Sequence, residues 1–296
     1  MAGDAPGPED GPDFADAPSR AAIEQALRRL ADQPSEAIDL AGTALLLAAL
    51  ERPRVSLERY RLHLHEIEAA LARRAAGRPD SPSALEHRAI MLIEVLRTEM
   101  NYRGDDLTYD DLQNANLMRV IDRRKGLPVA LGILYLHAAR AQRWTAYGLN
   151  FPGHFLIALE SDGTRLVIDP FTGRRLEGAN ELRALLKAVA GQSAELTPQH
   201  CAPLSNRAVL LRLENNIKAR LIAQGRHEKA AAVLDRMLLF APRDVDLWHE
   251  AGVEHARAGN LKAATGALEQ VLAMARQPEV RRAAAELLQS LRRRLN

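Results

Sequence analysis

The chain has 296 residues, of which 47% are hydrophobic and 4% aromatic, and its 40 Lys and Arg nearly balance its 38 Asp and Glu. This length has room for two domains of ordinary size, while the balanced charge gives no electrostatic case for binding nucleic acid or a membrane surface. A single cysteine, Cys201, excludes an intramolecular disulfide and fits a reducing compartment. No signal peptide is visible, and the longest apolar stretch, residues 44–50, is too short to span a bilayer. We therefore expect a cytoplasmic protein that binds neither nucleic acid nor membranes.

Helical patterns dominate the first hundred residues. Residues 1–19 are rich in Pro, Gly, Ala and Asp without periodicity, which predicts a disordered acidic tail. Beyond them, apolar residues recur at three- and four-residue spacing. This pattern predicts a helix starting near residue 21, a second with Ser35 as its N-cap, a third over residues 57–74 and a fourth after Asp80-Ser81-Pro82.

The middle of the chain predicts a small sheet packed on a buried helix. Residues 129–143 are apolar almost all round, which is typical of a buried helix. Three strands are expected after it, at residues 145–150, 154–160 and 165–168, and the turn signal Asp162-Gly163 joins the last two in a hairpin. Together these elements indicate an α+β domain with a small antiparallel sheet over residues 20–200.

The last third of the chain is helical and repeats itself. Gly225 and Gly259 are 34 residues apart, and so are Leu234 and Leu268. This is the period of tetratricopeptide repeats, in which each unit is a pair of antiparallel helices. We predict an all-α repeat module with a capping helix over residues 207–296. It should pack against the preceding domain, because two units are too few to stand alone, and present a surface to a protein or peptide partner.

His154 and Asp169 are the pair that points most directly to chemistry. With Asp162 and Gly163 as the hairpin loop, Asp169 lies opposite Leu156. Alternation along the strands then places His154 and Asp169 on one face, close enough to hydrogen-bond. A carboxylate beside an imidazole is the base and orienter of a catalytic triad. A histidine on an apolar strand is equally well a structural residue, so both interpretations stand.

Several motifs around this pair are similar to those of one protein family. They are Asn101-Tyr-Arg-Gly-Asp105, Arg123-Arg-Lys-Gly-Leu-Pro-Val-Ala-Leu131, Asn150-Phe-Pro-Gly-His154-Phe and Ile168-Asp-Pro-Phe171. Together they resemble the SirB family, bacterial transglutaminase-like proteins with C-terminal tetratricopeptide repeats. The resemblance extends over residues 40–275. It implies a papain-like core in which a catalytic cysteine, histidine and aspartate follow one another along the chain.

One member of that triad is missing from this sequence. His154 and Asp169 match the second and third residues. The cysteine would lie near Gly126-Leu127-Pro128, at the start of the buried helix, where the helix dipole favours a thiolate. No Cys, Ser or Thr occurs between residues 127 and 142. We expect Val129 or Ala130 where the sulfur would be, which implies a remnant triad without acyl-transfer activity.

Polar residues near the core supply the candidate binding residues Arg103, Asp105, Arg123 and Asn150. Arg and Asp this close together usually cap helices and pair with each other. The functional alternative is that Arg103 or Arg123 lines a groove near His154 and binds an anionic or peptide ligand.

Neither the lone thiol nor a nearby pair of histidines indicates a further site. Cys201 follows His200 in a predicted loop, and sequence neighbours on a loop rarely form a Cys–His pair. His63 and His65 would point to nearly opposite sides of a helix. The motifs of zinc sites, phosphate-binding loops and dinucleotide sites are also missing from the sequence. We therefore expect neither a metal nor another cofactor.

Three functions are compatible with the sequence. The favoured one is a non-catalytic transglutaminase-like protein that binds a protein or peptide through its groove and its helical repeats. The alternative is a hydrolase or acyl-transferase with His154 as base, Asp169 as orienter, and water or an external group as nucleophile. The third is a regulator whose groove binds a small metabolite.

Overall fold

The computed structural model describes residues 17–76 and 84–295. Most of the predicted acidic tail and the expected start of the fourth helix at residues 80–82 lie outside these residues. The N-terminal helices are α1 (Arg20–Arg29), α2 (Leu40–Ala49), α3 (Glu58–Ala75), α4 (Ala84–Ile93), α5 (Leu117–Arg123) and α6 (Pro128–Ala141). A π-helical turn, Glu94–Glu99, continues α4. Within residues 17–76 and 84–295, none of the helices combines the length and the apolar character needed to cross a bilayer.

Two sheets follow the expected α+β plan. The short strands β1 (Arg103–Gly104) and β2 (Lys125–Gly126) pair in parallel. The larger sheet is antiparallel and contains, in spatial order, β3 (Thr145–Gly148), β4 (Ile157–Ser161), β5 (Thr164–Asp169) and β6 (Arg174–Leu176). The small antiparallel sheet is therefore confirmed.

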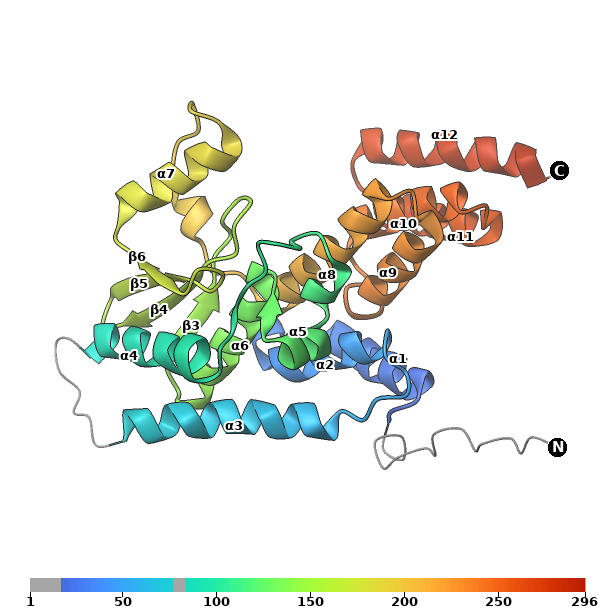
Figure 1. Cartoon of the computed structure of the whole chain (residues 1–296). Coiled ribbons are helices and arrows are strands. Elements are labelled where there is room, and N and C mark those ends of the chain that lie inside the picture. Colours follow the sequence, from blue (N-terminus) through green and yellow to red (C-terminus); the bar gives the residue numbers. More distant parts are fainter. Residues whose placement is uncertain (1–16, 77–83, 296) are drawn as a thin grey trace, which may run out of the picture.

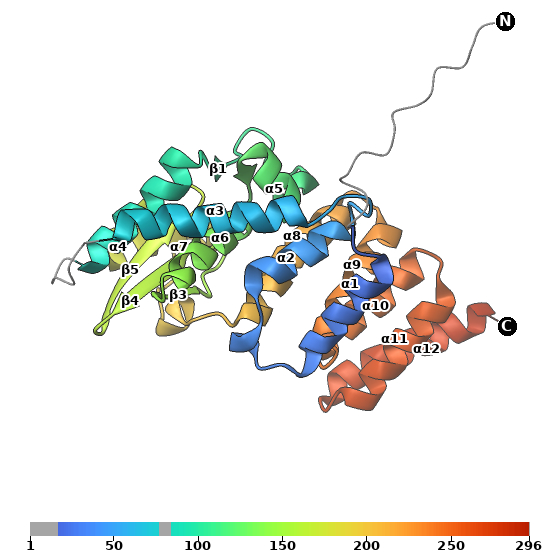
Figure 2. The same ribbon diagram turned by 90° about the horizontal axis from the view of Figure 1, so that it is seen from below.

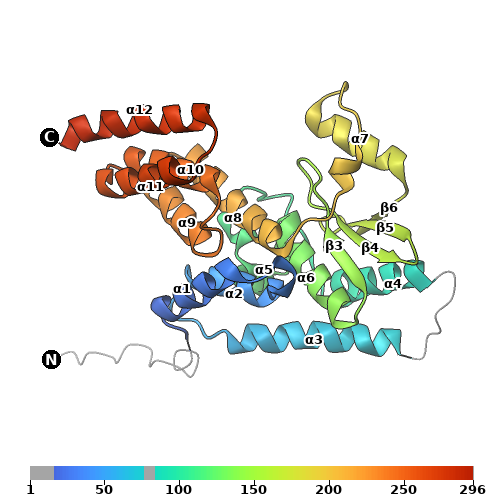
Figure 3. The same ribbon diagram turned by 180° about the vertical axis from the view of Figure 1, so that it is seen from behind.

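The larger sheet separates two layers (Figure 1). One face, with Phe155, Ile157 and Ile168, joins the main core together with α6. The other face carries a smaller apolar cluster, which is completed by Leu182 and Leu186 of α7 (Ala179–Ala190). Figure 3 shows α7 standing over that outer face, on the opposite side from α4. We call these the inner and outer faces of the sheet.

The rest of the chain forms antiparallel helix pairs, as the 34-residue period predicts. These are α8 (Asn206–Ala223) with α9 (His227–Phe240), and α10 (Val245–Arg257) with α11 (Leu261–Met274), followed by α12 (Pro278–Leu295). Gly225 and Gly259 have positive φ angles of 68° and 79° in the turns inside the two pairs, which explains the spaced glycines.

α8 is shared between the two parts of the molecule. It packs against α9 on one side and against α2 and α6 on the other, while α1 packs against α9. Seen from below in Figure 2, α1 and α2 lie alongside the repeat helices. The repeats are thus joined to the first part by a broad contact, as expected for an array too short to stand alone.

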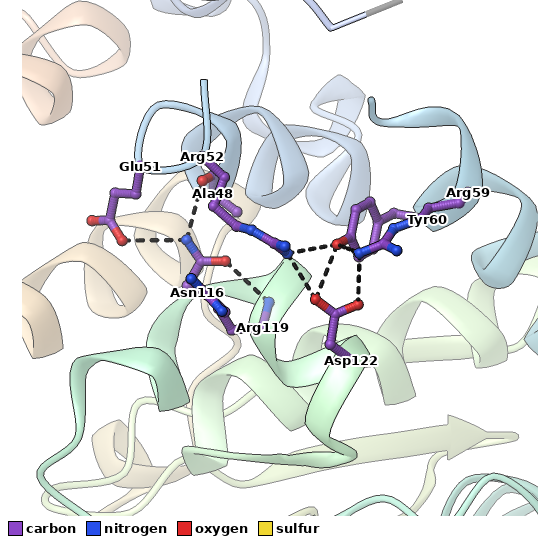
Figure 4. A network of polar contacts seen from close by, with 8 residues as sticks. All are labelled: Ala48, Glu51, Arg52, Arg59, Tyr60, Asn116, Arg119 and Asp122. Atoms are coloured by element: carbon purple, nitrogen blue, oxygen red, sulfur yellow. Dashed lines mark hydrogen bonds and ion pairs between the residues drawn. The ribbon is translucent and has the colours of Figure 1, made fainter. Parts of the chain in front are cut away.

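A polar network fixes α5, which leads into β2 and α6 (Figure 4). Arg52 donates to Asp122 Oδ2 at 2.7 Å, and Arg59 donates to Asp122 Oδ1 at 3.1 Å. Asn116, the N-cap of α5, also donates to the carbonyl of Ala48 at 3.1 Å. These bonds connect α5 to the end of α2 and the start of α3.

Two local predictions need correction. Ser35 does not cap the second helix, because residues 35–37 form a separate 3-10 turn; Asp39 is the N-cap, and its carboxylate accepts from the amide of Gly42 at 3.1 Å. The strand expected to begin at His154 begins at Ile157.

Candidate functional site

The β4–β5 hairpin has the predicted register. Ile157 pairs with Ile168, and the two-residue loop contains Asp162 and Gly163 with φ angles of 51° and 74°. Two positive φ angles are those of a type I′ turn. Continued by one residue, the register places Asp169 opposite Leu156, as expected.

The expected hydrogen bond between His154 and Asp169 is not formed. Among the residues that the structure describes, no hydrogen bond joins the two side chains. Asp169 instead accepts from the Phe171 amide at 2.9 Å and from the Thr172 hydroxyl at 2.8 Å, so its carboxylate stabilises the turn after β5. The physical reason is a bend before β4. The amide of His154 donates to the carbonyl of Pro152 at 2.8 Å, and strand alternation therefore stops short of His154.

The start of α6 lies beside the turn that contains Phe171. The Gly104 amide donates to the carbonyl of Phe171 at 3.0 Å, and the next amide, that of Asp105, donates to the carbonyl of Gly126 at 3.3 Å. α6 then begins at Pro128 without a side-chain cap. Its first turn presents only apolar side chains, so it offers no nucleophile next to the position of Asp169.

Cys201 lies on the other side of the sheet. Its side chain packs with the apolar cluster on the outer face, and it lines a cavity of about 520 Å³ between β5, β6 and α7. α6 packs on the inner face. The sheet therefore separates the one thiol of the chain from the helix start where the resemblance places a nucleophile.

Arg212 of α8 holds the segment that carries His154. Its guanidinium donates to the carbonyls of Phe151 at 2.8 Å and His154 at 2.5 Å, and it lies 5.6 Å from the centroid of the Phe155 ring. Burial lowers the pKa of Arg212. Sequence reasoning missed this residue, because a lone arginine on a helix 58 residues away reads as a surface residue.

Arg220, two turns further along α8, holds the loop before α5. It donates to the carbonyl of Tyr109 at 3.3 Å, forms an ion pair with Asp110 at 3.2 Å, and stacks 5.2 Å from the Tyr109 ring. Tyr109 in turn meets Phe171 edge-on at 5.8 Å. One helix thus positions both the segment that carries His154 and the loop before α5.

The predicted binding residues divide into two kinds. Arg123 donates to Asp105 at 2.7 Å, and the hydroxyl and amide of Thr108 donate to the same carboxylate. Burial alone would raise the pKa of Asp105, but these bonds outweigh burial and lower it. Arg103 and Asn150 have exposed side chains with no hydrogen bond or ion pair within the described chain.

His63 belongs to a separate buried group. Its Nε2 is contacted by Arg124 and lies 2.9 Å from the Tyr102 hydroxyl, while its Nδ1 lies 2.7 Å from Glu66. Burial lowers the pKa of His63, and the charge of Arg124 acts in the same direction. Across residues 17–76 and 84–295, no cluster of three or more His, Cys, Asp or Glu side chains is arranged to hold a metal ion.

Comparison with known proteins agrees with this architecture. Residues 58–215 match the transglutaminase-like superfamily, and residues 217–289 match tetratricopeptide repeats, so the two matches meet inside α8. A UPF0162 protein of Xylella fastidiosa (strain Temecula1) is 29% identical over 257 residues, which cover 84% of this chain and 90% of that protein. A UPF0162 protein of Vibrio cholerae serotype O1 is 30% identical over 218 residues, which cover 73% of this chain and 78% of that protein.

One similar solved structure is a crystal structure of menin that reveals its binding site for the Mixed Lineage Leukemia protein. It is 10% identical, with a TM-score of 0.40, and the match covers 86% of this chain and 69% of that one. The superfamily match spans more than half of the chain, and the Vibrio relative is aligned over most of its own length. The resemblance to SirB proteins is therefore confirmed: the chain belongs to the transglutaminase-like superfamily, among the UPF0162 proteins, and carries tetratricopeptide repeats after its core.

Proposed function

We propose that this protein acts by binding a protein or peptide partner and does not catalyse acyl transfer. The observation that supports the proposal is the apolar start of α6: Pro128, Val129 and Ala130 occupy its first turn, where the family resemblance implies a nucleophile. Acyl transfer to a thiol or hydroxyl requires that group within hydrogen-bond reach of a base. Among the described residues, no hydrogen bond joins His154 to a residue of α6 or to Cys201, although the His154 ring meets Phe151 of the outer-face cluster that Cys201 also packs with.

The repeat module, residues 207–296, is the proposed partner-binding part, acting in the cytoplasm. Tetratricopeptide repeats generally mediate protein–protein interaction. Since α8 is occupied by α2 and α6, we place the binding surface on α10 and α12. A segment of the partner would also lie along the transglutaminase-like domain, which carries the remnant triad of His154 and Asp169. There, the exposed side chains of Arg103 and Asn150 supply polar contacts to it.

The test of catalysis compares three proteins: the wild type, Cys201→Ala and His154→Ala. Each is incubated with amine-donor and peptide substrates. We expect equal background rates in all three, because water attacks an amide poorly without an oxyanion site and a strong base acting together. Turnover lost in Cys201→Ala would show that the distant thiol is recruited. Turnover lost only in His154→Ala would show a water-based hydrolase. Either result would overturn the proposal.

The test of binding uses surface charge reversals. Arg282→Glu with Arg293→Glu changes the exposed face of α12, and Arg73→Glu on α3 is the matched control, since all three side chains are exposed. Capture of a defined partner should fail in the α12 variant and persist in Arg73→Glu and His154→Ala. Capture unaffected by the α12 changes would contradict the assignment to the repeats.

A further inference from the structure

A cavity lies in the seam between the N-terminal arm, residues 31–35, and the repeat helices. Its volume is about 580 Å³, and its repeat side is formed by the start of α8, the end of α9 and the start of α10. We call it the seam cavity. We propose that the seam cavity binds a ligand that combines an apolar side group with a free carboxylate, as the C-terminal residue of a peptide or a small organic acid does. This inference is independent of whether the remnant triad is active.

The wall of the seam cavity suits an apolar group. Leu211, Phe240, Ala241 and Pro242 line it on the repeat side, and Pro34 lines it on the arm. Ligand sites are commonly cavities of about 300–1,000 Å³ with a mainly apolar lining and a few placed polar groups. The seam cavity fits this description, and its volume is enough for one large side chain with its backbone.

Two guanidinium groups stand at the seam cavity. Arg207 is held in place by the carbonyls of Leu30 and Gln33, each at 2.8 Å, and by the carbonyl of Phe240. A guanidinium has five N–H donors, so two donors of Arg207 have no acceptor among the described residues. Arg243 also lines the cavity, with 82% of its side chain exposed.

Within the described chain, neither carboxylate that lines the seam cavity forms an ion pair with Arg207. Asp244 also lines the cavity, but its carboxylate caps α10 by accepting from the amides of Asp246 and Leu247 at 3.1 and 3.2 Å. This leaves Asp32, which pairs with Arg243 at 2.8 Å and is itself 83% exposed. Such an exposed pair contributes about 0–1 kcal/mol, so a ligand carboxylate can replace Asp32 at little cost.

The two guanidinium groups also influence each other. Burial lowers the pKa of Arg207, and the charge of Arg243 lowers it further. A carboxylate placed between them would relieve this repulsion. Guanidinium binds the planar carboxylate in a two-point geometry. An inorganic anion alone would leave the apolar wall of the seam cavity exposed to water. We therefore assign a ligand that has both an apolar group and a carboxylate.

Trp248 provides a direct signal for the test. Its indole N–H donates to the carbonyl of Pro242 at 2.8 Å, in the wall of the seam cavity. The chain has one other tryptophan, Trp144, so Trp144→Phe makes the fluorescence specific. In this background, we would titrate N-acetylphenylalanine and a pentapeptide ending in phenylalanine. Their C-terminal amides and inorganic phosphate would serve as controls.

We expect a saturable change with the free acids and a much weaker one with the amides and phosphate. Arg243→Gln should weaken acid binding by about tenfold or more, the loss of one charge-assisted hydrogen bond, whereas Asp32→Asn should strengthen it. Arg73→Gln on α3, another exposed arginine, is the matched control and should change nothing. The stronger of the two acids identifies the source, a peptide end or a free acid. Equal binding of acid and amide, equal binding of phosphate, or no effect of Arg243→Gln would overturn the proposal.

Discussion

α6 and α8 are both enclosed by other elements, yet they bury different chemistry. The buried face of α6 is apolar except for the Tyr135 hydroxyl, whereas α8 buries Asn206, Glu214 and Lys218 among its leucines. Glu214 accepts from Arg236 of α9, which also pairs with Glu51 at the end of α2 at 3.0 Å. Apolar packing fills volume, while directional polar pairs also select the neighbour. α6 therefore supplies the bulk of the core, and α8 specifies how the repeats join it.

The largest effect should come from breaking the buried pair on α8. Glu214→Ala leaves Arg236 without its buried partner, and we expect a loss of about 3–5 kcal/mol in the free energy of unfolding. Urea unfolding at pH 7 measures it. The double variant Glu214→Leu with Arg236→Met removes both charges and should lose far less. A loss of less than about 1 kcal/mol in Glu214→Ala is what an exposed ion pair would give. That result would contradict the difference proposed between α6 and α8.

A cavity in α6 should cost somewhat less. Leu134 is fully buried, and Leu134→Ala should lose about 3 kcal/mol through lost transfer energy and the cavity left behind. Leu107, which is 83% exposed, gives the matched control Leu107→Ala, expected within about 0.5 kcal/mol of wild type. Similar losses in both variants would mean that α6 is not the packing centre.

The arginines of α8 should act more locally. Arg212→Met removes the donors to the carbonyls of Phe151 and His154, and hydrogen bonds from a charged donor contribute about 1.5–3 kcal/mol. We expect faster amide hydrogen exchange over residues 151–156 with little change at residues 107–110. Arg220→Met should give the reverse pattern. Uniform acceleration in both variants would show that α8 does not hold the two loops separately.

The smallest effect concerns pH and centres on His63 of α3. His63 has a lowered pKa in the folded state, so the unfolded chain binds its proton more readily. Stability should therefore fall as the pH drops below about 6.5, the ordinary histidine value. Half-buried His137 of α6, whose pKa is also lowered by burial, acts in the same direction. Unfolding at pH 7.5 and 5.5 should show a smaller difference for His63→Gln than for wild type.

Local chemistry decided which parts of the fold the sequence could predict. The hairpin register followed from Asp162 and Gly163, because a type I′ turn requires positive φ at two adjacent residues. The repeat followed from glycines 34 residues apart. By contrast, β6 has only three residues, which is too short for an alternation of apolar and polar residues, so the sequence does not predict it.

The candidate site was less predictable than the fold. Gly153, with a φ of 68°, marks the bend that keeps His154 off its strand, and the Pro-Gly pair before His154 was the available signal. The contacts of Arg212 and Arg220 were beyond reach, since they depend on how α8 packs against loops 58 to 111 residues away. The side of the sheet that Cys201 occupies likewise depends on the path of the chain after α7.

The position of α8 also sets an order for folding during synthesis. A nascent chain that ends before Asn206 already contains α2 and α6, but not the buried Leu210 and Leu213 that pack with the main core. Exposed apolar surface of this kind favours aggregation. The transglutaminase-like domain can therefore complete its core only after α8 has left the ribosome. Because α8 is also the first helix of the repeats, we expect the domain and the first repeat to fold together.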